Sequence, residues 1–326
     1  MELSSSFESR VELTKLKEKT DALRRAAGSI LVGQQKLFDL ILTALLADGH
    51  ILIEGVPGIA KTLAAKVIAR LIDADFSRIQ FTPDLMPSDV LGTSVYNMKK
   101  SEFEFKKGPL FSNVILIDEI NRSPAKTQAA LFEVMEERQI TVDGKSYIMD
   151  PLYIVLATQN PIEHEGTYKL PEAQIDRFLF KINIGYLNKE DEIEILNRHH
   201  ENIKLADVSG LKPEISSKDI LEFRSKIKDI HVEKNLIDYI ASIVEETRRN
   251  KSIYLGASPR AGISMLNGSK AFAALKGRDF VTPEDIKFVA EPVLNHRLIL
   301  TPESEMEGHT VIDVCNKIID KIEVPR

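Results

Sequence analysis

One segment, ILIEGVPGIAKTLAA at positions 51–65, constrains the fold of this chain more than any other. An apolar run typical of a buried strand leads into a turn rich in glycine and proline, and an apolar helical pattern begins at Lys61 and Thr62. The segment nearly matches the pattern G-x-x-x-x-G-K-S/T, whose backbone N–H groups surround phosphate at the N-terminus of a helix. We therefore expect a strand, a phosphate-binding loop and a helix, with the candidate nucleotide-binding residues Gly55, Val56, Pro57, Gly58, Ile59, Ala60, Lys61, Thr62 and Leu63.

The lysine and the threonine of this loop have separate expected roles. The ammonium group of Lys61 is expected to reach the β- and γ-phosphates, and the Thr62 hydroxyl to bind Mg²⁺. Ala60 stands where the pattern has a second glycine, and alanine fits there only if the backbone already has helical angles. The alternative is an ordinary strand–turn–helix corner in which the lysine has no function.

The composition favours a globular protein of about two domains. The chain has 326 residues, of which 43% are hydrophobic and 28% charged,. No apolar run approaches the roughly 20 residues of a membrane span, and the N-terminus lacks the pattern of a secretory signal. Cys315 is the only cysteine, which excludes an internal disulfide and fits a cytoplasmic protein,. The net charge of −6 argues against general nucleic-acid binding, because proteins that bind phosphate backbones are usually basic,.

Short apolar runs alternate with helical patterns over the first part of the chain. Such alternation predicts βαβ units and a parallel sheet of the α/β class. The expected strands are 51–54, 78–81, 114–118, 153–158 and 178–182. Helical patterns then dominate, at 190–199, 217–227, 234–249, 261–276 and 283–295. We therefore predict an α/β domain with N-terminal helices at 1–200 and a helical domain at 201–326.

Two adjacent carboxylates, Asp118 and Glu119, follow the apolar run of the third expected strand in the sequence VILIDEINR. Ligands bind at the carboxyl ends of parallel strands, so this position favours a functional site. Asp118 is expected to hold Mg²⁺, directly or through water, and Glu119 to orient and deprotonate the attacking water. The alternative is a strand that ends in a solvated acidic turn.

Three further side chains are candidates, each with a plain alternative. Asn160 ends the strand LYIVLATQNP, where an amide could lie between the γ-phosphate and the attacking water, or simply form an Asn-Pro turn,. Arg177, in LPEAQIDRF, is either an arginine finger that a neighbouring subunit supplies or a partner in a salt bridge, which its spacing alone favours,. Arg260 follows the expected helix cap Ser258 and the first helical residue Pro259,. A cation there opposes the helix dipole, which favours an external anionic partner over a solvated side chain.

With these residues in place, the chain resembles the MoxR family of AAA+ ATPases from about residue 32 to residue 297. The resemblance is carried by EGVPGIAKT, IDEINRSPAKTQAALFEVMEERQ, LATQNPIEHEGTYKLPEAQIDRF, GASPRA and VLNHRL. Alanine before the lysine is usual in that family, which implies a working loop. The resemblance implies these roles: Lys61 and Thr62 as Walker A, Asp118 and Glu119 as Walker B, Asn160 as sensor 1, Arg177 as the finger acting in trans, Arg260 as sensor 2, and Gly33 and Gln34 as part of the adenine pocket.

The resemblance also implies an architecture and an activity. The family fold is a five-stranded parallel sheet between helices, followed by an all-α lid. Residues 84–108 resemble the helix-2 insert, which faces the ring pore, and 140–148 resemble the hairpin before sensor 1, where Asp143-Gly144 is a strong turn signal. The implied function is ATP hydrolysis with Mg²⁺ in a homo-oligomeric ring, usually a hexamer, that acts as a chaperone-like motor on a protein client, often one with a von Willebrand factor A domain. Arg122 competes with Arg177 for the interface role.

Other functional classes remain as alternatives. A GTP switch is suggested by Asn188–Asp191, which fits N-K-x-D, and by DVLG at 89–92, although Asn188 more simply caps the helix that follows. A DNA-remodelling motor would need a DNA-binding element, and we find neither a helix-turn-helix nor a zinc site. An ATP-dependent assembly switch without turnover would not need the intact Glu119.

Overall fold

The computed structural model describes residues 11–55, 61–160, 168, 170–201 and 207–325. By its internal contacts the chain divides into two compact units, one formed by Leu23–Leu221 and the other by Glu222–Arg326 with the described part of Met1–Ala22. The limits of the units fall inside helices α1 (Thr14–Gly28) and α8 (Ser217–Ile227). The assignment of an ATPase core to residues 1–200 and of a lid to residues 201–326 stays a prediction.

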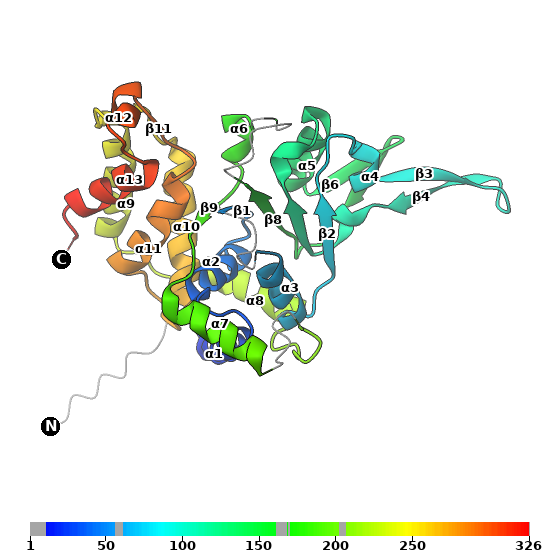
Figure 1. Cartoon of the computed structure of the whole chain (residues 1–326), viewed down its shortest axis with the longest axis horizontal. Helices are drawn as coiled ribbons and strands as arrows, with labels where there is room; N and C mark the ends of the chain where they lie inside the picture. Colours follow the sequence, from blue (N-terminus) through cyan, green and yellow to red (C-terminus); the bar gives the residue numbers. More distant parts are fainter. Residues whose placement is uncertain (1–10, 56–60, 161–167, 169, 202–206, 326) are drawn as a thin grey trace. The chain divides into compact units, whose positions relative to one another are not determined.

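A five-stranded parallel sheet with strand order β2-β5-β8-β1-β9 forms the centre of the first unit (Figure 1). Its strands are β1 (Ile51–Gly55), β2 (Phe76–Gln80), β5 (Val114–Asp118), β8 (Ile154–Gln159) and β9 (Phe180–Ile184). Each begins and ends within two residues of its predicted position, and the predicted α/β class is confirmed. Because the strands are parallel, the residues that follow β1, β5 and β8 emerge at one edge of the sheet.

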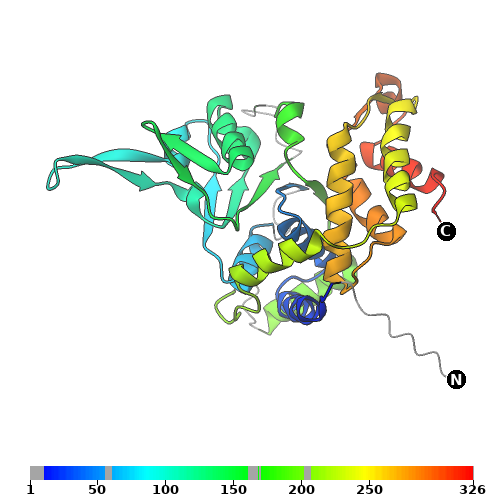
Figure 2. The same cartoon turned by 180° about the vertical axis from the view of Figure 1, so that it is seen from behind.

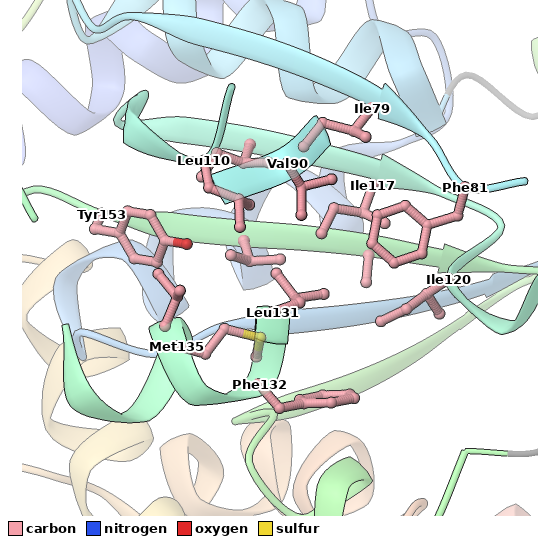
Figure 3. Packing of buried hydrophobic residues seen from close by; sticks show 14 of the residues in the cluster. Ile79, Phe81, Val90, Leu110, Ile117, Ile120, Leu131, Phe132, Met135 and Tyr153 are labelled. Atoms are coloured by element: carbon pink, nitrogen blue, oxygen red, sulfur yellow. The ribbon is translucent and has the colours of Figure 1, made fainter. Parts of the chain in front are cut away.

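Helices cover both faces of this sheet. On one face, Leu131, Phe132 and Met135 of α5 (Ala125–Glu137) pack in a single apolar cluster with Ile117 of β5 and with Tyr153 (Figure 3). On the other face lie α2 (Gln35–Leu46) and α3 (Lys61–Leu71) (Figure 1). Strands buried on both faces are apolar along their whole length, which is why continuous apolar runs marked them in the sequence.

Short elements connect the strands of this unit. They are α4 (Pro87–Leu91), η1 (Pro109–Phe111), η2 (Ile120–Arg122) and α6 (Glu172–Ile175), and α7 (Lys189–His200) follows the last strand, β9. The side chain of Asn188 accepts a hydrogen bond of 2.8 Å from the Asp191 N–H at the start of α7. The interpretation of Asn188 as a helix cap is therefore confirmed, which leaves no need for a GTP-binding role at this position.

Two β-hairpins extend from the first unit. The hairpin of β3 (Gly92–Asn97) and β4 (Glu102–Lys107) projects away from the sheet, as Figures 1 and 2 show. The second, β6 (Gln139–Val142) and β7 (Lys145–Ile148), turns at Asp143 and Gly144 with φ of 51° and 75°, as the sequence predicted. Phe105 of the first hairpin stacks on Tyr147 of the second at 4.4 Å between ring centroids. That the first hairpin faces a ring pore stays a prediction.

The second unit is mainly helical. Its elements are α9 (Lys234–Arg249), β10 (Ile253–Leu255), α10 (Pro259–Leu275), α11 (Pro283–Leu294), β11 (Ile299–Leu300), α12 (Pro302–Met306) and α13 (Val311–Lys321). The antiparallel pair β10–β11 was not predicted, because strands of three and two residues are too short to show an alternating pattern. Phe272 of α10 stacks on Phe288 of α11 at 3.8 Å, and the fully buried Asp285 accepts two hydrogen bonds from Arg278. None of the helices in the described ranges is long and apolar enough to cross a membrane.

Candidate nucleotide-binding site

The predicted phosphate loop lies between β1 and α3. Gly55 ends the strand and α3 begins at Lys61, so Thr62 and Leu63 lie in the first helical turn, as the sequence indicated. Val56, Pro57, Gly58, Ile59 and Ala60 lie outside the described residues. The described boundaries match the strand–loop–helix arrangement that the phosphate-loop hypothesis requires.

The ammonium group of Lys61 is turned toward the start of the loop. Its Nζ donates a hydrogen bond of 2.7 Å to the carbonyl oxygen of Gly55. Burial lowers the pKa of Lys61, and the negative charges of Asp118, Glu119 and Glu54 oppose that shift. The lysine is therefore within electrostatic reach of both predicted catalytic carboxylates, although they are nearly 60 residues away in the chain.

The two carboxylates occupy different positions at the end of β5. Asp118 is the last residue of the strand and only 8% exposed. Glu119 follows in the left-handed backbone region, with φ of 56° and ψ of 53°, which is uncommon for a residue other than glycine,. This backbone turn separates the directions of the two side chains, so that neighbouring residues can have different functions.

The hydroxyl of Thr158, on β8, links the two acids. It donates a hydrogen bond of 3.2 Å to Asp118 Oδ1 and accepts one of 3.0 Å from the backbone N–H of Glu119. Thr158 lies at the polar end of a predicted strand, but we predicted a function there only for Asn160. The contacts of Thr158 with the two acids arise from the pairing of β5 with β8. In the sequence, only its position at the end of a strand pointed to a role in the site.

Two arginines and one amide donate to the second oxygen of Asp118 and to one oxygen of Glu119. Arg78 Nε donates to Asp118 Oδ2 at 2.6 Å, while Gln80 Nε2 and Arg122 Nη1 donate to Glu119 Oε2 at 2.6 and 3.0 Å. Arg78 and Gln80 lie on β2, at the edge of the sheet, and both are exposed residues on either side of the buried Ile79. Neither residue was predicted as part of the site, because the register of β2 against β5 brings them to the acids and a local sequence pattern does not show register.

Two other predicted site residues of this unit are Asn160 and Arg177. Asn160 follows β8 and is 8% exposed. Arg177 Nη2 lies 2.7 Å from Glu136 Oε2, and its guanidinium lies 5.9 Å from the centre of the Phe132 ring. Arg177 therefore forms a salt bridge within its own chain, as the alternative interpretation expected. That it also acts on a neighbouring subunit stays a prediction.

Gly33 and Gln34 lie at the bend between α1 and α2. Gly33 has a φ of +70°, and a Cβ there would collide with the Asp191 carboxylate and with Leu187. The local backbone therefore requires glycine at this position, and this requirement does not depend on a contact with the adenine base of a nucleotide. Gln34 is 6% exposed and lines a cavity of about 310 Å³ together with apolar residues such as Phe38. A contact of either residue with adenine stays a prediction.

Arg260 belongs to the second unit. It is exposed in the first turn of α10, after Ser258 at the cap position and Pro259 as the first helical residue. The predicted helix start is confirmed, but the Ser258 side chain makes no capping hydrogen bond. The sensor role of Arg260 stays a prediction.

The chemistry of the first unit's donors fits a nucleotide with Mg²⁺. Mg²⁺ is usually held by one or two carboxylates together with phosphate oxygens and water, and Asp118 with the Thr62 hydroxyl supplies oxygen donors of this kind. Among the described residues, no group of three or more His, Cys, Asp or Glu side chains is placed to hold a metal by itself.

Lys61 at the start of α3, the paired acids at the end of β5 and the polar end of β8 follow parallel strands of one sheet, an arrangement typical of P-loop ATPases of the AAA+ class. Comparison with known proteins agrees: the model of the ATPase family associated with various cellular activities (AAA) matches residues 50–180, and that of the AAA lid domain matches residues 245–318. Chaperone MoxR1 of Mycobacterium tuberculosis is 42% identical over 91% of this chain and 80% of its own length. The chain belongs to the MoxR family of AAA+ ATPases, as the sequence resemblance indicated.

Two further relatives cover nearly the whole chain. The uncharacterised protein YeaC of Bacillus subtilis is 44% identical over 91% of this chain and 92% of its own length. The crystal structure of a candidate ATPase from Cytophaga hutchinsonii has a TM-score of 0.84 at 44% identity, and covers 96% of this chain and 99% of that protein. The fold of both units is therefore shared with these relatives.

Proposed function

We propose that this chain binds and hydrolyses ATP in a homo-oligomeric ring, most simply a hexamer, and acts as a chaperone-like motor on a protein client. The observation that carries the proposal is the convergence of Lys61 with Asp118 and Glu119 at the carboxyl ends of parallel strands. A cation for phosphate, an acid for metal and an acid for water are the groups that phosphoryl transfer to water requires.

Each side chain has a part in this reaction. Lys61 turns from the Gly55 carbonyl to the β- and γ-phosphates, and Asp118 with Thr62 would hold Mg²⁺,. When bound, Mg²⁺ neutralises phosphate charge and fixes the geometry of the phosphate chain. Glu119 accepts the proton of the attacking water, and Oε1 can do so while Gln80 and Arg122 donate to Oε2. Asn160 orients that water, and Arg260 responds to the γ-phosphate.

We assign the interface role to Arg177 rather than to Arg122. Arg122 donates to Glu119 of its own chain, so it serves the chain's own carboxylate. Arg177 instead pairs with Glu136, which is not one of the proposed catalytic acids, so a phosphate of a neighbouring subunit can compete for it without disturbing the chain's own site. Exposure does not separate the two arginines, because the side chain of Arg177 is 29% exposed and that of Arg122 is 40% exposed. An arginine that stabilises transferring phosphate from a neighbour can contribute about 10³–10⁵ in rate.

The client is proposed from the family rather than from a site. The relative in Mycobacterium tuberculosis is named a chaperone, which supports action on another protein. A partner with a von Willebrand factor A domain is the first candidate. Proteins retained by a Glu119→Gln variant in the presence of ATP would identify the client, because that variant should hold ATP without turning it over.

Nucleotide binding is tested by removing the loop lysine. Lys61→Ala should lose most of its affinity for a fluorescent ATP analogue, while far-UV circular dichroism stays unchanged. Lys66→Ala is the matched control, because Lys66 is an exposed lysine of the same helix. Equal affinity in the Lys61→Ala variant and the wild type would refute the assignment of the loop.

Action in trans is tested by mixing two inactive variants. Glu119→Gln loses its own reaction but still donates Arg177, whereas Arg177→Ala keeps its site but donates no arginine and should lose about 10³ or more in turnover. Mixed rings should recover part of the activity. If subunits exchange and no activity returns, Arg177 does not act in trans.

A further inference from the structure

Asp118, the proposed metal ligand, already has a cationic partner in the ligand-free chain. Arg78 Nε lies 2.6 Å from Asp118 Oδ2, and the Thr158 hydroxyl lies 3.2 Å from Asp118 Oδ1. Donors therefore occupy both oxygens of a carboxylate whose side chain is only 11% exposed. Each oxygen keeps a second lone pair, but a divalent cation and the guanidinium repel each other beside one carboxylate, so the two cations compete for Asp118.

Of the two donors, Arg78 is the one that can leave. Its side chain is 51% exposed and belongs to the edge strand β2, so the released guanidinium can move into solvent. Thr158 is 2% exposed on the central strand β8 and also holds the Glu119 N–H, so its hydroxyl is fixed by two contacts. Release of Arg78 is favourable only when another cation takes its place, because the guanidinium regains water while a buried carboxylate without a partner is strongly destabilising.

We propose that Arg78 is a positioning residue that supplies the positive charge beside Asp118 until Mg²⁺ and nucleotide bind, and that the metal, bound directly or through water, would then take over this compensation of charge. The inference rests on the proposed function of the same site. Before binding, Arg78 spares the buried Asp118 an uncompensated charge and keeps the carboxylate in place. The consequence is competition: the guanidinium lowers the affinity of the site for metal and sets the metal dependence of nucleotide binding.

A purely structural ion pair would behave differently. It would lower the stability of the sheet edge when broken, and any loss of metal binding would follow from the loss of fold. An arginine that contacts phosphate directly would weaken nucleotide binding with and without metal when removed. Of these three explanations, only competition with metal predicts that the metal-bound state becomes more favourable when the arginine is removed.

The experiment measures the dissociation constant of fluorescent ADP in EDTA and in excess Mg²⁺. For Arg78→Gln, the ratio of the constant in EDTA to that in Mg²⁺ should rise about fivefold over the wild-type ratio, the size expected when a half-exposed ion pair stops competing. In a second measurement, Mn²⁺ binding to the chain without nucleotide, followed by electron paramagnetic resonance, should tighten by a similar factor.

Two variants separate charge from structure. Arg78→Lys should keep a ratio near that of the wild type, because the contact uses Nε and a lysine Nζ reaches one bond further along the side chain. Arg198→Gln is the matched control, since Arg198 makes an Nε–carboxylate contact of 2.7 Å with Glu194 on α7. If Arg78→Gln does not fold, Arg78→Met keeps the aliphatic stem and carries the same expectation.

The outcomes are distinct. An unchanged or lower ratio in Arg78→Gln, together with unchanged Mn²⁺ affinity, would overturn the competition. Equal effects of Arg78→Lys and Arg78→Gln would also overturn it, because charge would then not be the cause. Failure of the wild type to bind ADP in either buffer would instead refute the proposed function, and the Mn²⁺ measurement would then decide the role of Arg78 alone.

Discussion

Substitution of Thr158 by valine tests whether one hydroxyl holds both catalytic acids. Valine has nearly the shape of threonine but can neither donate to Asp118 Oδ1 nor accept from the Glu119 N–H. Thr158 is 2% exposed, so water does not readily replace the lost contacts. The backbone N–H of Glu119 would be left without its acceptor in a left-handed conformation that already costs about 1–2 kcal/mol.

The expected destabilisation is about 2–3 kcal/mol. Leaving a buried donor without a partner costs about 1–3 kcal/mol, and the long contact of 3.2 Å to the carboxylate adds less,. Thr158→Ser keeps the hydroxyl and loses one methyl group, for which the cost is about 1 kcal/mol. The valine variant should therefore be less stable than the serine variant by about 1–2 kcal/mol, which corresponds to roughly a five- to thirtyfold change in an opening equilibrium.

Amide hydrogen exchange provides the assay, because it reports on Glu119 itself and does not require the two units to unfold together. In Thr158→Val the Glu119 amide should exchange about five- to thirtyfold faster than in Thr158→Ser, while amides in β9 change little. Hydrolysis should fall in the valine variant with nucleotide affinity retained. Equal exchange at Glu119 in the two variants would refute the reasoning that the hydroxyl orders this backbone.

Two further predictions concern buried groups outside the site. Tyr153 is fully buried and its hydroxyl has no hydrogen-bond partner in the described parts of the chain. Tyr153→Phe should therefore leave the free energy of unfolding unchanged or raise it by about 1 kcal/mol. If urea unfolding showed that this free energy falls by more than about 1 kcal/mol, the hydroxyl would have a partner. Burial, and secondarily the charge of Glu291, raises the pKa of Cys315 from 9.0 to about 12. The unfolded chain loses this proton first, so between these pH values the free energy of unfolding should fall by up to about 1.4 kcal/mol per pH unit relative to Cys315→Ala. Equal pH slopes in the two proteins would contradict the raised pKa.

How far the sequence predicted the fold depends on burial. The strand 114–118 was predicted with its observed limits, because four apolar residues end abruptly at an acid. The limits of β2 were predicted less well, since an edge strand carries exposed polar residues such as Arg78 and reads less clearly as a strand. Helix α8 was predicted with its observed limits, whereas β10 and β11 were too short to leave a pattern.

The site was predictable where its chemistry follows from chain position. Asp118 and Glu119 stand at the end of β5 and Lys61 begins the helix that comes after β1, and parallel strands bring such positions to one edge,. The contacts of Arg78, Gln80 and Thr158 were not predictable, because each depends on the register between strands that are about 40 residues apart. A one-residue shift of β2 would turn Arg78 to the opposite face of the sheet. Register is a property of packing across the whole sheet and not of any local segment.

These unpredicted contacts indicate that ligand binding at this site is an exchange of ion pairs. In the ligand-free chain Arg78 neutralises Asp118, Arg122 neutralises Glu119, and Lys61 is held by a carbonyl of the loop. Adding ATP with Mg²⁺ brings both signs of charge, so the metal can take the place of Arg78 while phosphate takes the ammonium of Lys61. The carboxylates then never stand uncompensated at any stage, which avoids the penalty for an isolated buried charge. On this reasoning, removal of Arg78 should alter the order and the metal dependence of binding more than the final affinity, whereas removal of Lys61, the cation that phosphate takes, should lower the affinity itself.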